Sequence, residues 1–164
     1  MKLVINNDYG GFGLSPKGLK RYLELKGKQA YFYIQTSYHF LADGARFSRV
    51  DNIEHMNTLF FYCTTRDQGA IVSDYPEDVV YGGEIERNDP ILVQVVEELG
   101  SEASGSYAHL VVKEIENGRW YKITEYDGFE SIEYRDIDDE WMLAEEINNE
   151  NTKNQGYGAP YDCS

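Results

Sequence analysis

The residues best suited to chemistry form a glycine-rich segment close to the N-terminus. An apolar run at residues 3–5 is followed by Asn-Asn-Asp-Tyr-Gly-Gly-Phe-Gly, and then by Leu, Ser15 and Pro16. Ser as an N-cap and Pro at the first helical position indicate that a helix begins here. A glycine-rich loop that leads into a helix N-terminus offers backbone N–H groups to anions and polar ligands. The ligand-binding residues predicted in this loop are Asn6, Asp8, Tyr9, Gly10, Gly11 and Phe12.

The same loop also has a purely structural explanation. Its glycines suit the positive φ angles of a tight turn, and Asn6 and Asp8 can bond to the local backbone. The loop lacks the Gly-Lys-Ser/Thr ending of a P-loop and the spacing of a dinucleotide-binding fingerprint. Tyr9 and Phe12, however, are aromatic residues that a structural turn does not require. Both interpretations stay open on the sequence.

A second candidate lies at Glu125 and Asp127, next to Gly128. If this segment shared a sheet edge with the glycine-rich loop, Asp8 would complete a carboxylate cluster suited to acid–base chemistry or a divalent cation. The alternative is that Asp-Gly is an ordinary turn dipeptide. The histidines share no metal-like spacing, and no Ser/His/Asp or Cys/His order is legible. The sequence therefore predicts no catalytic residue, metal site or cofactor, and it leaves enzymatic activity open.

An acidic stretch near the C-terminus is a third candidate. Residues 137–147 favour a short helix with several carboxylates around one tryptophan. An exposed acidic helix with an aromatic anchor is suited to binding a partner. The alternative is an amphipathic helix that buries Trp141 and Leu143 and leaves its charges in solvent. The partner-binding residues predicted here are Asp138, Asp139, Glu140, Trp141 and Glu145.

The charge of the chain is unevenly distributed. The formal net charge is −14; residues 1–66 hold 9 Lys and Arg against 5 Asp and Glu (9 − 5 = +4), and residues 67–164 hold 6 against 24 (6 − 24 = −18). An acidic surface can dock on a basic partner or imitate nucleic acid, although acidity also serves solubility. Direct binding to nucleic acid is not expected, because that affinity comes mostly from Lys and Arg.

Two helices and several strands must position these groups. One helix is expected from Ser15 to Gly27, and another from a cap at Asn88 or Asp89 to Gly100. Asn-Gly at residues 117–118 predicts a hairpin between the strands on either side of it. The runs that predict strands lie at residues 3–5, 30–40, 58–65, 70–72, 108–115, 120–125 and 129–132.

These elements predict an α+β fold, because hairpin-type connections replace a regular β-α-β alternation. We expect a single domain over residues 1–147, with a mostly antiparallel or mixed sheet of five to six strands and two to three helices. Residues 148–164 are polar and predict a flexible tail. Two cysteines, no signal peptide and no run of about 20 apolar residues predict a soluble, reducing, intracellular setting away from membranes.

Three blocks of the chain resemble a family of small, mostly uncharacterised proteins from tailed bacteriophages and some large viruses. They are the opening Lys-Leu-Val-Ile-Asn-x-x-Tyr-Gly-Gly-Phe-Gly-Leu-Ser, residues 87–105 and residues 123–130. The family often has Cys or a similar small residue where this chain has Asp8, which weakens a role in thiol chemistry. The resemblance implies a viral accessory protein that works in the cytoplasm of an infected bacterial host.

The leading functional hypothesis is an accessory protein that binds and neutralises a host component, for example in counter-defence, without catalysis. Its partner would be a host protein with a basic surface, bound through the acidic C-terminal part, the edge of the glycine-rich loop, or both. The alternative is a protein that binds a small nucleotide or nucleotide signal, or a hydrolase, using Asn6, Asp8, Glu125 and Asp127. A second alternative is an acidic mimic of DNA.

Overall fold

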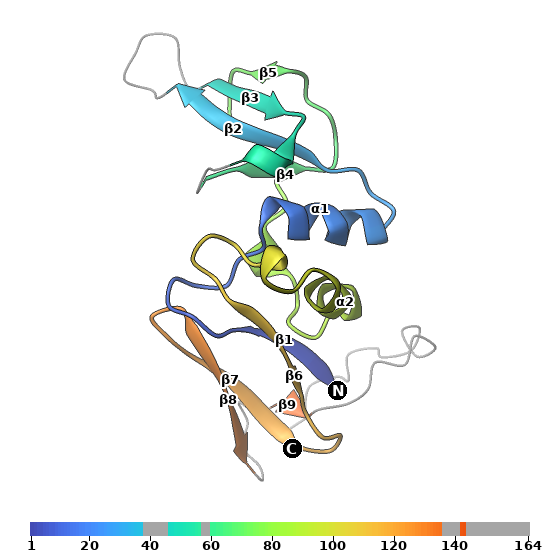
Figure 1. The fold of residues 1–164 in the computed structure, drawn as a ribbon, viewed down its shortest axis with the longest axis vertical. Helices are drawn as coiled ribbons and strands as arrows, with labels where there is room; N and C mark the ends of the chain where they lie inside the picture. Colours follow the sequence, from blue (N-terminus) through green and yellow to red (C-terminus); the bar gives the residue numbers. More distant parts are fainter. Residues whose placement is uncertain (38–45, 57–59, 136–141, 144–164) are drawn as a thin grey trace, which may run out of the picture.

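The computed structural model describes residues 1–37, 46–56, 60–135 and 142–143, and within these ranges it contains two α-helices and nine strands (Figure 1). Three 3₁₀ turns, η1 (Ile53–His55), η2 (Gly82–Glu84) and η3 (Gly100–Ala103), complete the set. The helices are α1 (Pro16–Leu25) and α2 (Pro90–Leu99). The strands are β1 (Lys2–Asn6), β2 (Tyr31–Ser37), β3 (Arg46–Val50), β4 (Tyr62–Thr64), β5 (Ile71–Val72), β6 (Leu110–Glu114), β7 (Trp120–Tyr126), β8 (Phe129–Arg135) and β9 (Met142–Leu143).

The strands form three separate antiparallel sheets, in the orders β1-β6, β4-β2-β3-β5 and β8-β7-β9. The α+β fold and the antiparallel pairing are thus confirmed. The expectation of one sheet with five to six strands is wrong. It treated each long apolar run as one strand of a common sheet, and it missed short strands such as β3, whose residues show no continuous apolar run.

Both helices begin and end where local chemistry directs. Ser15 caps α1 by accepting a hydrogen bond from the N–H of Gly18 (3.0 Å), and Asp89 caps α2 by accepting one from the N–H of Ile91 (2.8 Å). Gly27 and Gly100, at the two C-terminal ends, have positive φ angles of 69° and 57°. The predicted caps and stops are confirmed.

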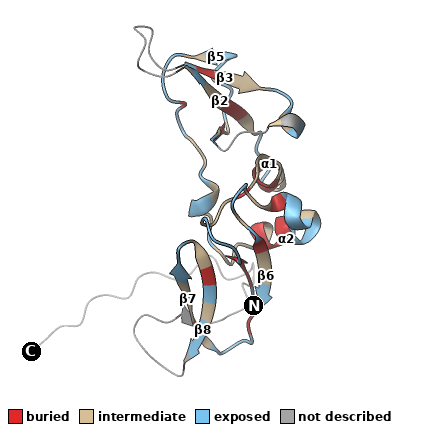
Figure 2. Ribbon diagram, turned by 60° about the vertical axis from the view of Figure 1, so that its left-hand side comes forward, coloured by how far each residue is buried: buried red, intermediate tan, exposed pale blue. Residues whose placement is uncertain are grey.

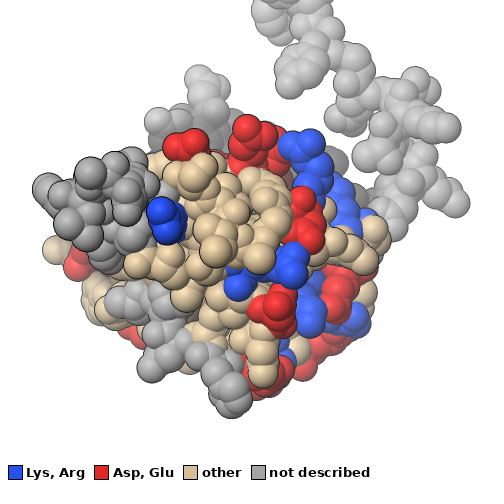
Figure 3. All heavy atoms as spheres, turned by 90° about the horizontal axis from the view of Figure 1, so that it is seen from above, with Lys and Arg blue, Asp and Glu red and all other residues tan. Residues whose placement is uncertain are grey.

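The two parts of the chain, which differ in net charge, form ion pairs with each other in the folded structure. Cations of β1 and α1 pair with carboxylates of α2 and its neighbours: Lys2 with Glu97, Lys17 with Glu102, Arg21 with Glu98, and Lys26 with Asp89. Figure 3 looks down on the end of the molecule formed by the β4-β2-β3-β5 sheet, and acidic and basic side chains are intermixed along one side of it. Exposed pairs of this kind add little stability each, and the two helices also pack together in a shared hydrophobic core.

Strand β1 lies between two hydrophobic cores. Val4 packs into the larger core, which both helices line, and Leu3 and Ile5 pack into a smaller core with Ile115 and Tyr121. This alternation follows from the two-residue period of a strand. Figure 1 shows β1 and β6 between the helices and the β7–β8 hairpin, and Figure 2 shows buried residues on both helices.

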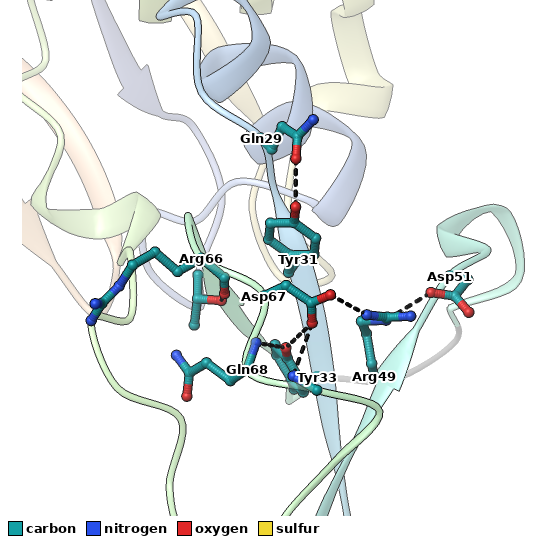
Figure 4. A network of polar contacts seen from close by, with 10 residues as sticks. Gln29, Tyr31, Tyr33, Arg49, Asp51, Arg66, Asp67 and Gln68 are labelled. Carbon is teal, nitrogen blue, oxygen red and sulfur yellow. Dashed lines mark hydrogen bonds and ion pairs between the residues drawn. The ribbon is translucent and has the colours of Figure 1, made fainter.

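The β4-β2-β3-β5 sheet buries aromatic residues on both faces. Phe32 packs toward the helices, while Tyr33 and Phe47 form a third core on the opposite face. The Tyr33 hydroxyl accepts from the N–H of Gln68 (2.8 Å) and donates to Asp67, which also pairs with Arg49 (2.5 Å; Figure 4). The N–H of Gly69 and the Arg49 guanidinium hold the pKa of Asp67 below its usual value. This network fixes the segment after β4 over the sheet.

Two expectations about the second half of the chain are wrong. The strands that flank Asn117-Gly118 do not pair with each other: β6 pairs with β1, and β7 pairs with β8. The hairpin forms instead at Asp127-Gly128, where both residues have positive φ (51° and 85°), as a two-residue type I′ turn requires. The helix expected over residues 137–147 is contradicted at Met142 and Leu143, which form β9 by pairing with β7.

The N-cap of α2 gives a testable pH dependence. Burial raises the pKa of Asp89, but hydrogen bonds from Lys26, Tyr22 and the Ile91 N–H outweigh that effect and lower it. Because the pKa of Asp89 is lower in the folded than in the unfolded state, its charge stabilises the fold at pH values above the unfolded-state pKa of about 3.9. This stabilisation is lost as the pH falls through the folded-state pKa. Asp89→Asn, which keeps the cap, should reduce the free energy of unfolding by about 1 kcal/mol at neutral pH.

The measurement is urea denaturation of both proteins at neutral and strongly acidic pH. The difference between them should vanish in acid, where the native carboxyl is protonated as well. A constant difference at all pH values would show that the Asp89 charge does not contribute in this way.

Candidate functional site

The glycine-rich loop and the β7–β8 turn meet in space. The Gly10 N–H donates to the Asp127 carbonyl (3.2 Å), and the Asn6 side-chain amide donates to the Gly128 carbonyl (2.7 Å). Gly128 packs so closely that a Cβ there would lie 2.1 Å from the nitrogen of Gly11. We name residues 6–12, 104–109 and 125–130 the loop junction. The sequence left open whether the two candidate segments are neighbours, and the structure brings them together.

Asn6 holds the three segments of the loop junction together. Its side chain is fully buried, and its amide nitrogen also donates to the carbonyl of Asp8 (2.7 Å). Its side-chain oxygen accepts from the N–H of His109 (2.8 Å), while its own N–H donates to a carboxylate oxygen of Glu130 (2.7 Å). These bonds use both the donors and the acceptor of the amide. Asn6 therefore positions the loops, rather than presenting an amide at the surface.

Two glycines are required by this close packing. Gly10 has a φ of 123°, and a Cβ there would lie 2.6 Å from the Cβ of Tyr107. Gly128 combines a positive φ with the contact to Gly11 described above. A side chain at either position would push the segments apart. By contrast, Gly11 has a positive φ but open space beside it.

The three predicted carboxylates lie at or near the surface of the loop junction. Asp8 accepts from the N–H of Tyr9 (2.8 Å), and Glu125 accepts from the N–H of Gly128 (2.6 Å). Asp127 occupies the first central position of the exposed turn. Among the residues that the structure describes, no group of three or more His, Cys, Asp or Glu side chains is arranged to hold a metal ion. The predicted carboxylate cluster is therefore not built as a metal site.

A cleft of about 520 Å³ opens beside the glycine-rich loop and is lined by Glu125 and Asp127. Arg87 also lines it, and the guanidinium carbon of Arg87 lies 3.4 Å from the centre of the Phe12 ring. Arg87 also pairs with Glu130 (2.9 Å), which is buried and lines the same cleft. The cleft thus holds three carboxylates and one guanidinium that is already paired.

Arg87 and Glu130 were not among the predicted site residues. One signal was present: the two-residue period of β8 places Glu130 on the same face as Ile132, which packs against the smaller core. A carboxylate at a core-facing position requires a partner. The partner itself, Arg87, lies 43 residues away, so nothing local in the sequence identifies it.

A second hollow of about 350 Å³ lies beside the glycine-rich loop and the start of α1. It is lined by Phe12, Met56, Phe61 and Tyr107, and by small residues that include Ser106. None of the described residues that line it is charged. The two hollows share Gly10, Gly11 and Phe12, so they adjoin each other across the loop.

Three tyrosines are exposed around the loop junction. Tyr9, Tyr107 and Tyr126 have 60%, 62% and 78% of their surface exposed. Tyr9 packs against Phe129, with 5.6 Å between the ring centres. Of the three, the sequence singled out Tyr9 alone, because nothing local indicates that Tyr107 and Tyr126 are brought to the same place.

The remaining candidates contribute less. The predicted partner-binding residues Asp138, Asp139, Glu140, Trp141 and Glu145 lie outside the described residues. Cys63 is buried in the larger core, and burial raises the pKa of its thiol to about 12. A thiol with that pKa stays protonated at neutral pH and is not a nucleophile.

The role of Asn6 predicts a large effect of one substitution. Asn6→Ala removes three hydrogen bonds of a fully buried side chain and leaves a cavity in its place, and should lower the free energy of unfolding by about 3 kcal/mol. The matched control is Asn7→Ala, because the Asn7 side chain is exposed; it should change stability by less than about 0.5 kcal/mol. Urea denaturation measures both variants, and equal effects would contradict the role given to Asn6.

Comparisons with known proteins add no further constraint on the site. No family model, no curated protein and no solved structure matches this chain. None of the helices in the described ranges has the length and apolar character needed to cross a bilayer. The case for a function therefore depends on the geometry of the loop junction.

Proposed function

We propose that this protein acts by binding a protein partner, and that the loop junction is the surface that binds. The observation that carries the proposal is the exposure of Tyr9, Tyr107 and Tyr126 on a hydrogen-bonded frame. The packing of this frame depends on the glycines and on Asn6, whereas the three exposed rings contribute little to it. Tyrosine is enriched at protein interfaces, where it often supplies much of the binding energy.

The rigidity of the frame supports binding. Loops that must be ordered on association lose affinity, because the loss of conformational entropy opposes binding. At the loop junction, the backbone of each segment is already bonded to another: Gly10 to Asp127, Asn6 to Gly128, and His109 to Asn6. The tyrosines are therefore presented on loops that need little further ordering.

Charge indicates what kind of partner fits. Asp8, Glu125 and Asp127 take part in none of the ion pairs between described residues, and the whole chain carries a net charge of −14. A negative surface attracts a basic partner and speeds its association. The resemblance to phage and large-virus proteins extends the proposal, in which the partner is a host component that binding neutralises.

The two alternative functions have less support. A nucleotide in the cleft would bring its phosphates next to Glu125, Asp127 and Glu130. Among the described residues of the lining, the only cation is Arg87, which already pairs with Glu130. Like charges in such proximity oppose binding. A mimic of DNA needs a run of free carboxylates, but several carboxylates of α2 pair with cations of α1 and β1.

The test removes exposed rings without disturbing the fold. In Tyr9→Ser/Tyr126→Ser, we expect a partner recovered from host lysate to be lost, with binding weakened by about 100-fold, because each ring is a contact residue. The control is Tyr134→Ser, which lies toward the other end of the same hairpin and is 44% exposed. The measurements are quantitative recovery on immobilised protein, and thermal unfolding to confirm the fold of each variant.

Recovery by the wild type and by Tyr134→Ser alone supports the proposal. If the double variant recovered the same partner as well as the wild type does, the loop junction would not be the binding surface.

A further inference from the structure

We propose that the partner binds with a short extended segment that carries one cationic and one apolar side chain, the first in the cleft and the second in the uncharged hollow. This inference rests on the proposed function and names the chemistry of the partner. It starts from the two hollows, which share residues 10–12 and otherwise have different linings.

The cleft selects a cation. Arg87 and Glu130 neutralise each other, with their charged atoms 2.9 Å apart. The remaining charged residues of the lining are Glu125 and Asp127, so the cleft has a surplus of negative charge. Glu125 uses one carboxylate oxygen to accept from Gly128 (2.6 Å), and neither residue forms an ion pair with a described cation. A guanidinium or ammonium group from the partner would supply the missing charge, and an arginine can bond to carboxylates in a bidentate manner.

The other hollow selects an apolar group. Phe61 and Tyr107 are aromatic residues of its lining, and Met56 supplies a flexible side chain that adapts to different shapes. No described side chain there is charged. An apolar group that enters the hollow therefore displaces no water from an ion, which would be unfavourable. The exposed ring of Tyr107 lies at the same place and extends the apolar surface.

An extended segment can reach both hollows at once. Gly10, Gly11 and Phe12 line both of them, so a chain that crosses the glycine-rich loop passes from one to the other. The space beside Gly11, where a side chain would otherwise lie, is open, so Gly11 does not obstruct the crossing. In an extended peptide, residues two positions apart point to the same side and are separated by roughly 7 Å, so two side chains that face the protein can enter neighbouring hollows. Charge and shape together favour a basic peptide over a nucleic acid, whose phosphates the carboxylates repel.

The experiment uses random peptides displayed on yeast and selected on the wild-type protein. We expect the enriched peptides to combine Lys or Arg with an aliphatic or aromatic residue a few positions away. Binding of one synthetic peptide is then measured by fluorescence polarisation. Glu125→Gln/Asp127→Asn should weaken it by about tenfold. Asn is chosen because it tolerates the positive φ of residue 127.

Two further variants separate local from general effects. Asp74→Asn/Glu77→Gln removes the same charge from another part of the surface and should leave the affinity unchanged. Ser106→Trp places a ring at an exposed position that lines the apolar hollow, and should weaken the peptide by about tenfold by filling it. Thermal unfolding confirms that each variant is folded.

Several outcomes would overturn the inference. These are enriched peptides without a basic residue, equal effects of the two charge-removing variants, or unchanged affinity in Ser106→Trp. A rise in melting temperature with ATP or cyclic nucleotides that Glu125→Gln/Asp127→Asn abolishes would assign the cleft to nucleotides instead. If these results appear while Tyr9→Ser/Tyr126→Ser still loses its protein partner, the partner chemistry is wrong and the proposed function stands.

Discussion

The loop junction depends on one buried amide. Asn6 lies at the end of β1, where the strand leaves the two cores that it separates, and its side chain bonds to the backbone of Asp8, His109 and Gly128. These three residues lie far apart from one another in sequence, so the amide joins loops at the ends of different strands into one surface. A buried amide that lacked these partners would destabilise the fold by more than its hydrogen bonds stabilise it. The strand and the loops are therefore specified together.

Local signals in the sequence predict much of the fold and little of the site. Ser15-Pro16 and Asp89-Pro90 determine where the helices begin, because capping involves neighbouring residues only. Strand pairing is different: Asn-Gly and Asp-Gly favour the same turn, yet Asp127-Gly128 makes the hairpin and β6 pairs with the N-terminal strand. This long-range strand pairing also determines that Arg87 pairs with Glu130. It brings Tyr107 and Tyr126 to the loop junction that contains Tyr9.

The proposed binding surface follows from the same arrangement. Close packing of Gly10 against Tyr107, and of Gly128 against Gly11, brings three backbone segments together, and Tyr9, Tyr107 and Tyr126 on these segments stay exposed. The glycine-rich loop then separates an acidic cleft from an uncharged hollow. Glu97 and Glu98 of α2 pair with cations of β1 and α1, and Glu130 pairs with Arg87, whereas Asp8, Glu125 and Asp127 take part in none of the ion pairs between described residues. An acidic protein can thus bind a basic partner at one specific surface, because only the carboxylates outside its internal ion pairs are available to that partner.

The most direct test of this account is amide hydrogen exchange, measured by NMR, at Gly10 and His109. Their N–H groups donate to the Asp127 carbonyl and to the Asn6 side chain, although both residues belong to loops. If the loop junction is preformed, these amides should exchange at least about 100-fold more slowly than an unprotected loop. Exchange at the unprotected rate would mean that the segments separate freely in solution, and the central claim of a preorganised surface would be wrong.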